Sequence, residues 1–279
     1  MPNAKDYQKG TQTKTLAYGP TGGGKSSAFL SHPGKKFVYI FDPAGLETYA
    51  GHDVEYEMFV PEIMGLKKSN LGKGSKSAEL LRPDPETYLR FEKDFEDRIK
   101  DRFFVGYDAL GFESLTTFLP MAMWYILEQQ GRGNSAPEIQ DYYYRTDAIS
   151  NIVRVAASQA NSVFFSAHCE AEKDEVTGRI ENMLSLPRSL KTGLPLLFSE
   201  VVQFRAEPNR DGNMKYVAQM KPDKRSPLVR TSLSNVQQFE DVTIDWNKPL
   251  AGQGFYGLYE KYKVMPEKEL REQNSIKMG

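Results

Sequence analysis

The sequence predicts an α/β fold in which a mostly parallel sheet is flanked by helices. The pattern G-x-x-x-x-G-K-[ST] occurs at residues 19–26, between an extended run at 13–18 and a segment that can start a helix. Continuous apolar runs at 37–41 and 162–168 are typical of strands buried on both faces. Two β-rich runs, 200–206 and 215–220, flank an Asp-Gly turn and predict a hairpin towards the C-terminus.

The pattern at residues 19–26 predicts a phosphate-binding P-loop, or Walker A motif. Glycines let successive backbone N–H groups turn towards phosphate oxygens, and the helix that follows adds the positive end of its dipole. Lys25 is expected to reach the β- and γ-phosphates, and the Ser26 hydroxyl to hold Mg²⁺. We therefore expect ATP and Mg²⁺ as cofactors, bound by Gly19, Pro20, Thr21, Gly22, Gly23, Gly24, Lys25, Ser26 and Ser27.

Two more strands are expected to end beside this loop. The run at 37–41 leads into Asp42, and open α/β sheets bind ligands at the carboxyl ends of their strands. Residues 107–118 hold a short apolar strand between two acids. Asp108 precedes the apolar stretch and is expected at the strand's entry, whereas Glu113 follows it. The sequence therefore favours Glu113 over Asp108 for the Mg²⁺ side.

Helices are predicted between these strands. Asp84-Pro85-Glu86 is typical of a helix start, and further helices are expected over 120–130 and 141–159. The strand at 162–168 ends in His168, for which two interpretations stay open: a contact to the γ-phosphate, and a structural histidine.

Composition narrows the classes of function. Hydrophobic residues make up 39% of the 279-residue chain and aromatics 12%, which is ample for a core. The 36 basic and 37 acidic residues argue against a broadly basic nucleic-acid binder. The single Cys169 excludes an internal disulfide and suits a reducing compartment. With neither a secretion signal nor an apolar run that could cross a bilayer, we expect a cytoplasmic protein without a membrane partner.

With these motifs in order, the chain resembles a phage-type RecA-like, AAA-class P-loop ATPase over about residues 13–233. Residues 107–117 are similar to that family's Walker B segment, with Glu113 where Asp is usual. In RecA a catalytic Glu follows the strand after the P-loop helix. Ala44 stands at that position here, and Asp42 or Glu47 is the candidate substitute. We expect an N-terminal extension (1–12), an ATPase domain (13–235) with a basic loop insertion at about 62–82, and a C-terminal tail (236–279).

The resemblance also implies a homo-oligomer with nucleotide between subunits, in which a neighbour's basic side chain reaches the γ-phosphate. The candidates for this finger follow the hairpin, although an exposed charged turn is the alternative: Lys221, Lys224 and Arg225.

Single-stranded DNA is the macromolecular partner that the resemblance implies. In RecA the loop after the His-ended strand contacts DNA, and residues 170–193 hold that place, with Arg179, Arg188 and Lys191 as candidate contacts. The lysine-rich segment 65–77 is either a second phosphate-backbone contact or a solvated loop.

The leading hypothesis is an ATPase that converts ATP to ADP and phosphate and acts on single-stranded DNA in recombination, annealing or replication. Other phage recombination or replication proteins would be partners, and the host cytoplasm the location. The alternative is a nucleotide-binding assembly switch with weak or no hydrolysis and no direct DNA role, to which Glu113 and Ala44 would point. A small-molecule kinase would need an Arg-dense lid, which the sequence lacks.

Overall fold

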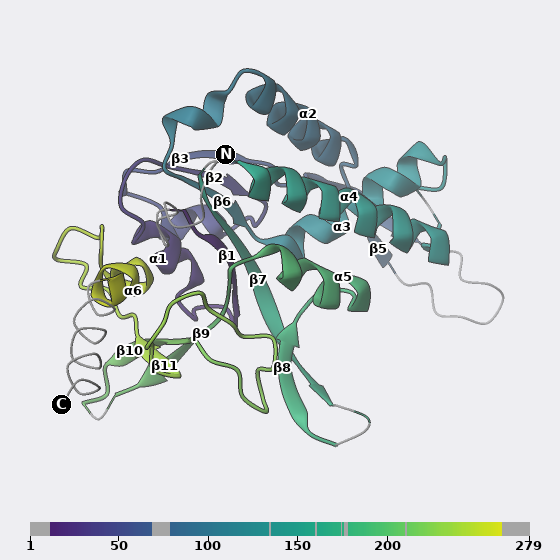
Figure 1. Ribbon diagram of the computed structural model, residues 1–279. Helices are drawn as coiled ribbons and strands as arrows, with labels where there is room; N and C mark the ends of the chain where they lie inside the picture. Colours follow the sequence, from purple (N-terminus) through teal and green to yellow (C-terminus); the bar gives the residue numbers. More distant parts are fainter. Residues whose placement is uncertain are drawn as a thin grey trace, which may run out of the picture.

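A mostly parallel sheet forms the centre of the molecule (Figure 1). The computed structural model describes residues 12–68, 79–133, 135–159, 161–173, 175, 178–209 and 211–263. The strand order is β11-β10-β9-β1-β7-β6-β2-β3, and β10 alone runs in the direction opposite to the other strands of this order. The strands span β1 (Lys14–Gly19), β2 (Lys36–Ile40), β3 (Glu55–Met58), β6 (Ala109–Glu113), β7 (Ser162–Lys173), β9 (Glu200–Pro208), β10 (Met214–Gln219) and β11 (Phe239–Asp241). The predicted fold class is confirmed.

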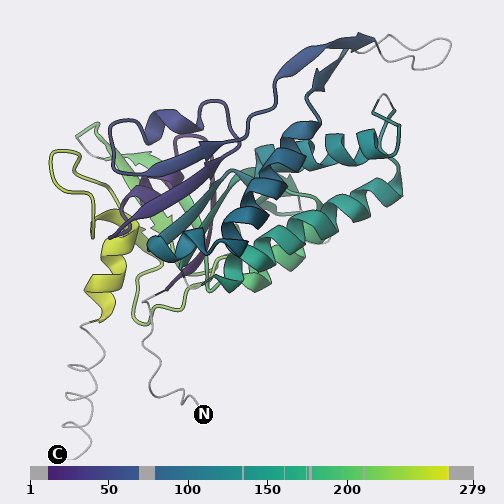
Figure 2. The ribbon, with the colours of Figure 1, turned by 90° about the horizontal axis from the view of Figure 1, so that it is seen from above.

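Helices cover both faces of the sheet (Figure 2). One face carries α2 (Glu86–Lys100), α3 (Leu115–Gln129), α4 (Ile139–Ser158) and the short α5 (Arg188–Gly193). The other carries α1 (Lys25–Leu30) and α6 (Gly254–Lys263). Successive strand residues point to opposite faces, so Phe164 packs with α1 and α6 while Phe165 packs under the longer helices. Continuous apolar strands result, because neither face meets water.

The helix after β6 begins earlier than the sequence predicts. The pattern places its start at Pro120, but α3 begins at Leu115 and contains the proline. Leu115 and Phe118 are each 1% exposed and pack into the core beneath the helix. Burial of this apolar stripe outweighs the backbone hydrogen bond that a proline removes.

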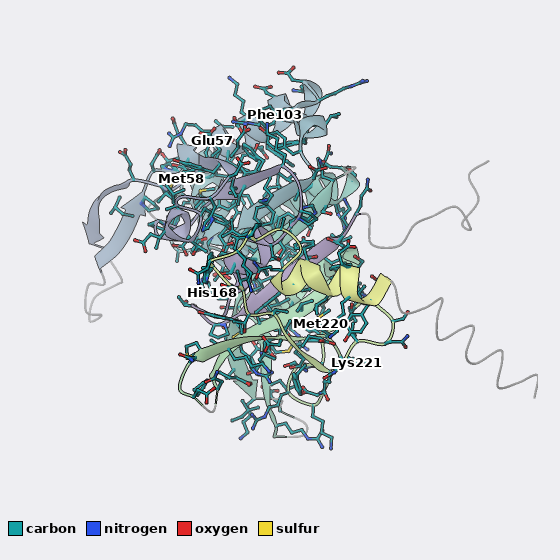
Figure 3. The ribbon with its side chains drawn as sticks, turned by 90° about the vertical axis from the view of Figure 1, so that its left-hand side faces the viewer. Glu57, Met58, Phe103, His168, Met220 and Lys221 are labelled. Atoms are coloured by element: carbon teal, nitrogen blue, oxygen red, sulfur yellow. The ribbon has the colours of Figure 1, made fainter. Side chains whose placement is uncertain are left out.

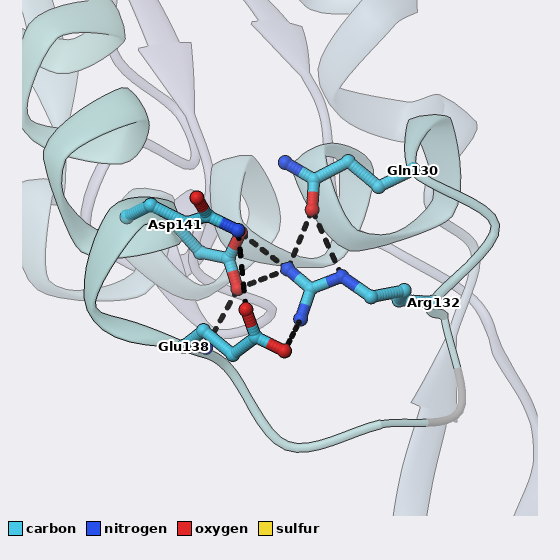
Figure 4. Close-up of polar contacts among 5 residues, drawn as sticks. Gln130, Arg132, Glu138 and Asp141 are labelled. Carbon is cyan, nitrogen blue, oxygen red and sulfur yellow. Dashed lines mark hydrogen bonds and ion pairs between the residues drawn. The ribbon is translucent and has the colours of Figure 1, made fainter.

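Figure 4 shows what holds the turn between α3 and α4. The Arg132 guanidinium donates to both carboxylate oxygens of Asp141, whose side chain is fully buried, and to Gln130 Oε1. The Glu138 N–H donates to Asp141 Oδ2 at 2.7 Å, which completes a capping box at the start of α4. The Asp141 carboxylate thus accepts a free backbone N–H at the start of α4 and also holds the Arg132 guanidinium.

Two segments expected to be loops contain strands. Within the predicted insertion at 62–82, β4 (Ile63–Lys68) pairs antiparallel with β5 (Glu79–Pro83), and this two-stranded sheet projects from the body of the molecule (Figure 2). Residues 69–78, with Lys73 and Lys76, lie outside the described residues. Within 170–193, β7 continues to Lys173 and pairs with β8 (Ile180–Leu184). β8 runs back along β7, and Leu184 at its end is fully buried before α5 begins.

The chain after residue 235, predicted as a C-terminal tail, packs against the domain as far as it is described. β11 pairs with β10, and α6 lies against α1. Phe255 is fully buried with its ring centroid 5.5 Å from that of Phe204 on β9. Tyr256, Tyr259 and Tyr262 are also buried, so α6 completes the core on this face of the sheet.

Candidate nucleotide-binding site

Three strands, β1, β2 and β6, end together at one edge of the sheet, where β7 passes through His168 and continues. Gly19 at the end of β1 is level with His168 on β7, and Ile40 at the end of β2 is level with Glu113 at the end of β6. Parallel strands expose their carboxyl ends at a common edge, where open α/β sheets bind ligands. The structure thus brings the P-loop, Glu113, His168 and Asp42 to one place.

Glycine is required at two positions of the P-loop. A Cβ at Gly19 would lie 2.1 Å from the Phe204 carbonyl oxygen on the neighbouring strand β9. Gly24 has φ +94°, and a Cβ there would lie 2.8 Å from Cδ1 of Tyr216. The first glycine therefore permits close strand packing, and the second permits the turn into α1.

Lys25, the first residue of α1, folds back over the loop. Its Nζ donates to the carbonyl oxygens of Gly19 at 3.1 Å and Pro20 at 2.9 Å, and only 6% of the residue is exposed. Burial lowers the pKa of the Lys25 ammonium, an effect that the negative charge of Glu113 opposes. The ammonium is therefore positioned at the loop, where phosphate oxygens would be stronger acceptors than these carbonyls.

Glu113 is a buried carboxylate beside the P-loop. It is 8% exposed, and the Tyr49 hydroxyl donates to its Oε2 at 2.9 Å. Burial raises the pKa of Glu113, while Lys25, Tyr49 and the neighbouring Ser26 hydroxyl favour its ionised form. The two residues expected to hold Mg²⁺, Ser26 and Glu113, thus lie beside one another.

A family comparison agrees with this geometry. The model of an AAA domain matches residues 11–227, which is more than half of the chain. The chain belongs to the AAA domain family. This is a family of P-loop ATPases that use ATP and Mg²⁺. No curated protein matches the chain. No helix among the described residues is both long enough and apolar enough to cross a membrane.

The donor set of this AAA domain fits Mg²⁺ held together with a nucleotide. Where the chain is described, no group of three or more His, Cys, Asp or Glu side chains could hold a metal by itself. Mg²⁺ is usually bound through one or two carboxylates together with substrate phosphates and water. Glu113 and Ser26 supply one carboxylate and one hydroxyl, which is enough only when phosphates complete the shell.

Asp108 lies at the other end of β6, as the sequence predicts. Its Oδ2 accepts a hydrogen bond from the Lys35 N–H at 2.7 Å, and the carboxylate packs against Gly34. Both contacts lie before β2 begins, at the amino edge of the sheet. The two acids of this segment are therefore separated by the length of the strand.

His168 and Asp42 flank the site. Burial and the charge of Lys25 lower the pKa of His168, which keeps its imidazole neutral near pH 7, while Asp42 opposes the shift. The backbone N–H of His168 donates to Thr116 Oγ1 at 2.9 Å. Asp42 Oδ1 accepts a hydrogen bond from the Ala44 N–H at 3.0 Å, and Ala44 itself is exposed.

The three basic residues predicted to contact DNA lie in different settings. Arg179 precedes β8, and Arg188 is the exposed first residue of α5. The Lys191 side chain is only 8% exposed and forms ion pairs with Glu170 and Glu172 on β7. The Lys191 ammonium is thus held by two carboxylates of β7, and its contact with DNA stays a prediction.

The finger candidates lie on an exposed loop that begins after Met220, the residue that follows β10 (Figure 3). Lys221, Lys224 and Arg225 are all exposed. The Asn182 N–H donates to the Arg225 carbonyl oxygen at 2.6 Å, which ties this loop to β8. The structure brings two separately predicted segments together here.

Two features of the site are missing from the sequence-based prediction. Tyr49, which binds Glu113, follows the short helix η2 (Gly45–Thr48), and no local pattern marks it. A hollow of about 430 Å³ opens beside P-loop residues 22–27. Part of its lining comes from the C-terminal segment, and only the tertiary fold brings that segment to the P-loop.

Proposed function

We propose that this AAA domain binds Mg²⁺ and ATP at the P-loop and hydrolyses ATP to ADP and phosphate. The observation that carries the proposal is the convergence of Lys25, Ser26 and the buried Glu113 at one edge of the sheet. A positive ammonium, a hydroxyl and a carboxylate around a glycine loop are the groups that phosphoryl transfer requires.

Each residue has a separate role in this proposal. The backbone N–H groups of residues 22–24 would surround the phosphates, and Lys25 would exchange its two carbonyl acceptors for phosphate oxygens. Ser26 and Glu113 would hold Mg²⁺, which supplies charge neutralisation at the phosphates when bound. Asp42 would orient the attacking water in place of the glutamate that Ala44 replaces, and neutral His168 would contact the γ-phosphate side.

Lys25→Ala should abolish ATP binding while leaving the fold intact, because the ammonium contacts only loop carbonyls. Calorimetric titration with Mg²⁺ and ATP measures the affinity, and circular dichroism checks folding. Lys35→Ala is the matched control, since Lys35 is exposed at the opposite edge and paired with Glu55. A folded Lys25→Ala protein with wild-type affinity would exclude this site.

We further propose that the ATPase acts on single-stranded DNA, as in recombination, annealing or replication. The β7–β8 ribbon continues directly from His168, so the β-strand that carries this residue at the nucleotide site also leads to the proposed DNA contacts. Arg179 directly precedes the return strand β8, Arg188 follows that strand at the start of α5, and the basic loop at 221–225 adjoins β8. A few phosphate contacts of this kind suffice for salt-dependent binding.

Fluorescence anisotropy with labelled single-stranded DNA at low salt, with and without ATP, tests this proposal. The double variant Arg179→Ala/Arg188→Ala should weaken binding and flatten the dependence on salt, without changing ATP affinity. Arg154→Ala, an exposed arginine on α4, is the control. If the wild-type protein binds no DNA under these conditions, the assembly-switch alternative takes its place.

We also propose that the protein works as a homo-oligomer in which Lys221, Lys224 and Arg225 reach a neighbour's nucleotide. These cations are exposed on the described chain, which fits a contact outside their own subunit. The triple alanine variant should lose ATP turnover about 10-fold or more while still binding ATP. Mixing it with Lys25→Ala subunits should restore part of the turnover, because each variant supplies what the other lacks. No restoration at any mixing ratio would argue against a shared site.

A further inference from the structure

The hollow beside the P-loop is lined by aromatic residues from three separate segments. Its lining joins P-loop residues 22–27 to His52, Tyr216 and Trp246. Its volume of about 430 Å³ lies in the range of small-molecule sites. A second hollow, of about 320 Å³, shares His52 and Trp246, so this pair, the aromatic wall, borders both spaces.

Trp246 is exposed although its backbone is held in place. Trp246 as a whole is 51% exposed, whereas Ile244, two residues earlier, is 8% exposed and buried. The Asp245 N–H donates to Gln253 Oε1 at 2.9 Å, and the Lys248 N–H donates to the Asp245 carbonyl oxygen at 3.1 Å. A large aromatic side chain that lines a hollow and is half exposed is arranged to contact a ligand.

The aromatic wall is linked to the metal side of the site. The centroids of His52 and Trp246 lie 5.5 Å apart at an interplanar angle of 40°. The His52 N–H donates to the Tyr49 carbonyl oxygen at 3.1 Å, and the Tyr49 hydroxyl binds Glu113. Tyr216, which lines the same hollow, packs against Gly24 of the P-loop. One hollow therefore offers a phosphate loop and an aromatic wall to the same molecule.

We propose that Trp246, with His52 beside it, is the stacking platform for the base of the nucleotide whose phosphates the P-loop holds. This inference rests on the proposed nucleotide binding. Stacking on an aromatic ring requires only a planar base, so the platform adds affinity for nucleotides over free polyphosphates. Trp246 lies beyond the residues 11–227 that match the family model. The base contact is therefore supplied by this chain's C-terminal segment.

The test compares ATP with inorganic tripolyphosphate, which has no base, by calorimetric titration in the presence of Mg²⁺. Trp246→Ala should weaken ATP binding about 10-fold, within the range of base–aromatic stacking, and leave tripolyphosphate binding unchanged. Tyr143→Ala is the matched control, because Tyr143 is a 68% exposed aromatic on α4.

Fluorescence gives an independent readout. The chain has two tryptophans, so Trp124→Phe leaves Trp246 as the single reporter. ATP should quench its emission, and tripolyphosphate should not. Wild-type ATP affinity in Trp246→Ala would overturn the stacking platform while leaving the P-loop assignment intact. Wild-type binding of both ligands by Lys25→Ala would instead overturn the P-loop assignment, and the platform with it.

Discussion

Lys25 and Glu113 carry opposite charges that are both withdrawn from water. Burial lowers the pKa of Lys25 and raises that of Glu113, although each charge favours the other. Desolvation therefore outweighs the attraction between them in the nucleotide-free protein. Phosphates and a metal ion would give both groups stronger partners, which is why the site is primed for a charged ligand.

Glu113→Gln should leave nucleotide binding largely intact and lower Mg²⁺-dependent turnover at least about 10-fold, because it removes the negative charge facing the metal. Steady-state phosphate release measures the effect. Asp108→Asn is the control, since Asp108 lies at the amino edge of β6. Loss of turnover in Asp108→Asn together with an active Glu113→Gln would reverse the assignment.

The Glu113→Gln substitution should also stabilise the nucleotide-free protein at neutral pH. A folded-state pKa raised above the unfolded value means that ionised Glu113 destabilises the fold. The loss of stability is absent at a pH below the pKa of Glu113 in the unfolded chain, and it is complete at a pH above its pKa in the folded protein. The melting temperature of Glu113→Gln should therefore exceed that of the wild type at pH 7, and the difference should shrink as the pH falls towards the unfolded value. Thermal melts at several pH values check this, and a less stable variant at pH 7 would contradict it.

At the scale of elements, the contact between β1 and β9 depends on the absence of a side chain at Gly19. Gly19→Ala would place a Cβ 2.1 Å from the Phe204 carbonyl oxygen, so one strand must move. We expect a loss of at least about 2 kcal/mol in the free energy of unfolding, measured by urea denaturation. Gly106→Ala meets no atom within 4 Å and should change stability by less than about 0.5 kcal/mol. Equal losses of stability in the two variants would show that the close contact between β1 and β9 does not limit the stability of the protein.

Element boundaries were predicted well where local chemistry sets them. The Asp84 carboxylate accepts from the Glu86 N–H at 3.0 Å at the start of α2, as its capping pattern indicates. The strand ending in Glu113 also lies where the apolar run placed it. The start of α3 and the β7–β8 ribbon were missed, because burial of Leu115 and Leu184 is decided by distant parts of the chain.

For the whole molecule, the described C-terminal residues are part of the core. Phe255→Ala should lower the free energy of unfolding by about 3–5 kcal/mol, because it removes a fully buried ring that packs on Phe204. Leu196→Ala, at a residue that is 73% exposed, is the control and should have little effect. Chemical denaturation measures both. A Phe255→Ala protein as stable as the wild type would mean that α6 contributes little to the fold.

The sequence by itself determined the phosphate loop and the strand-end acids, because a glycine pattern and apolar runs act through local backbone geometry. Only the tertiary structure decided which charges stay available and what completes the site. Lys191 is neutralised by Glu170 and Glu172 across a strand–helix contact. Tyr49 reaches Glu113 from a separate segment, and Trp246, more than two hundred residues further along the chain, lines the same hollow as the P-loop. Such pairings depend on sheet order and on packing between distant segments, which no local pattern encodes.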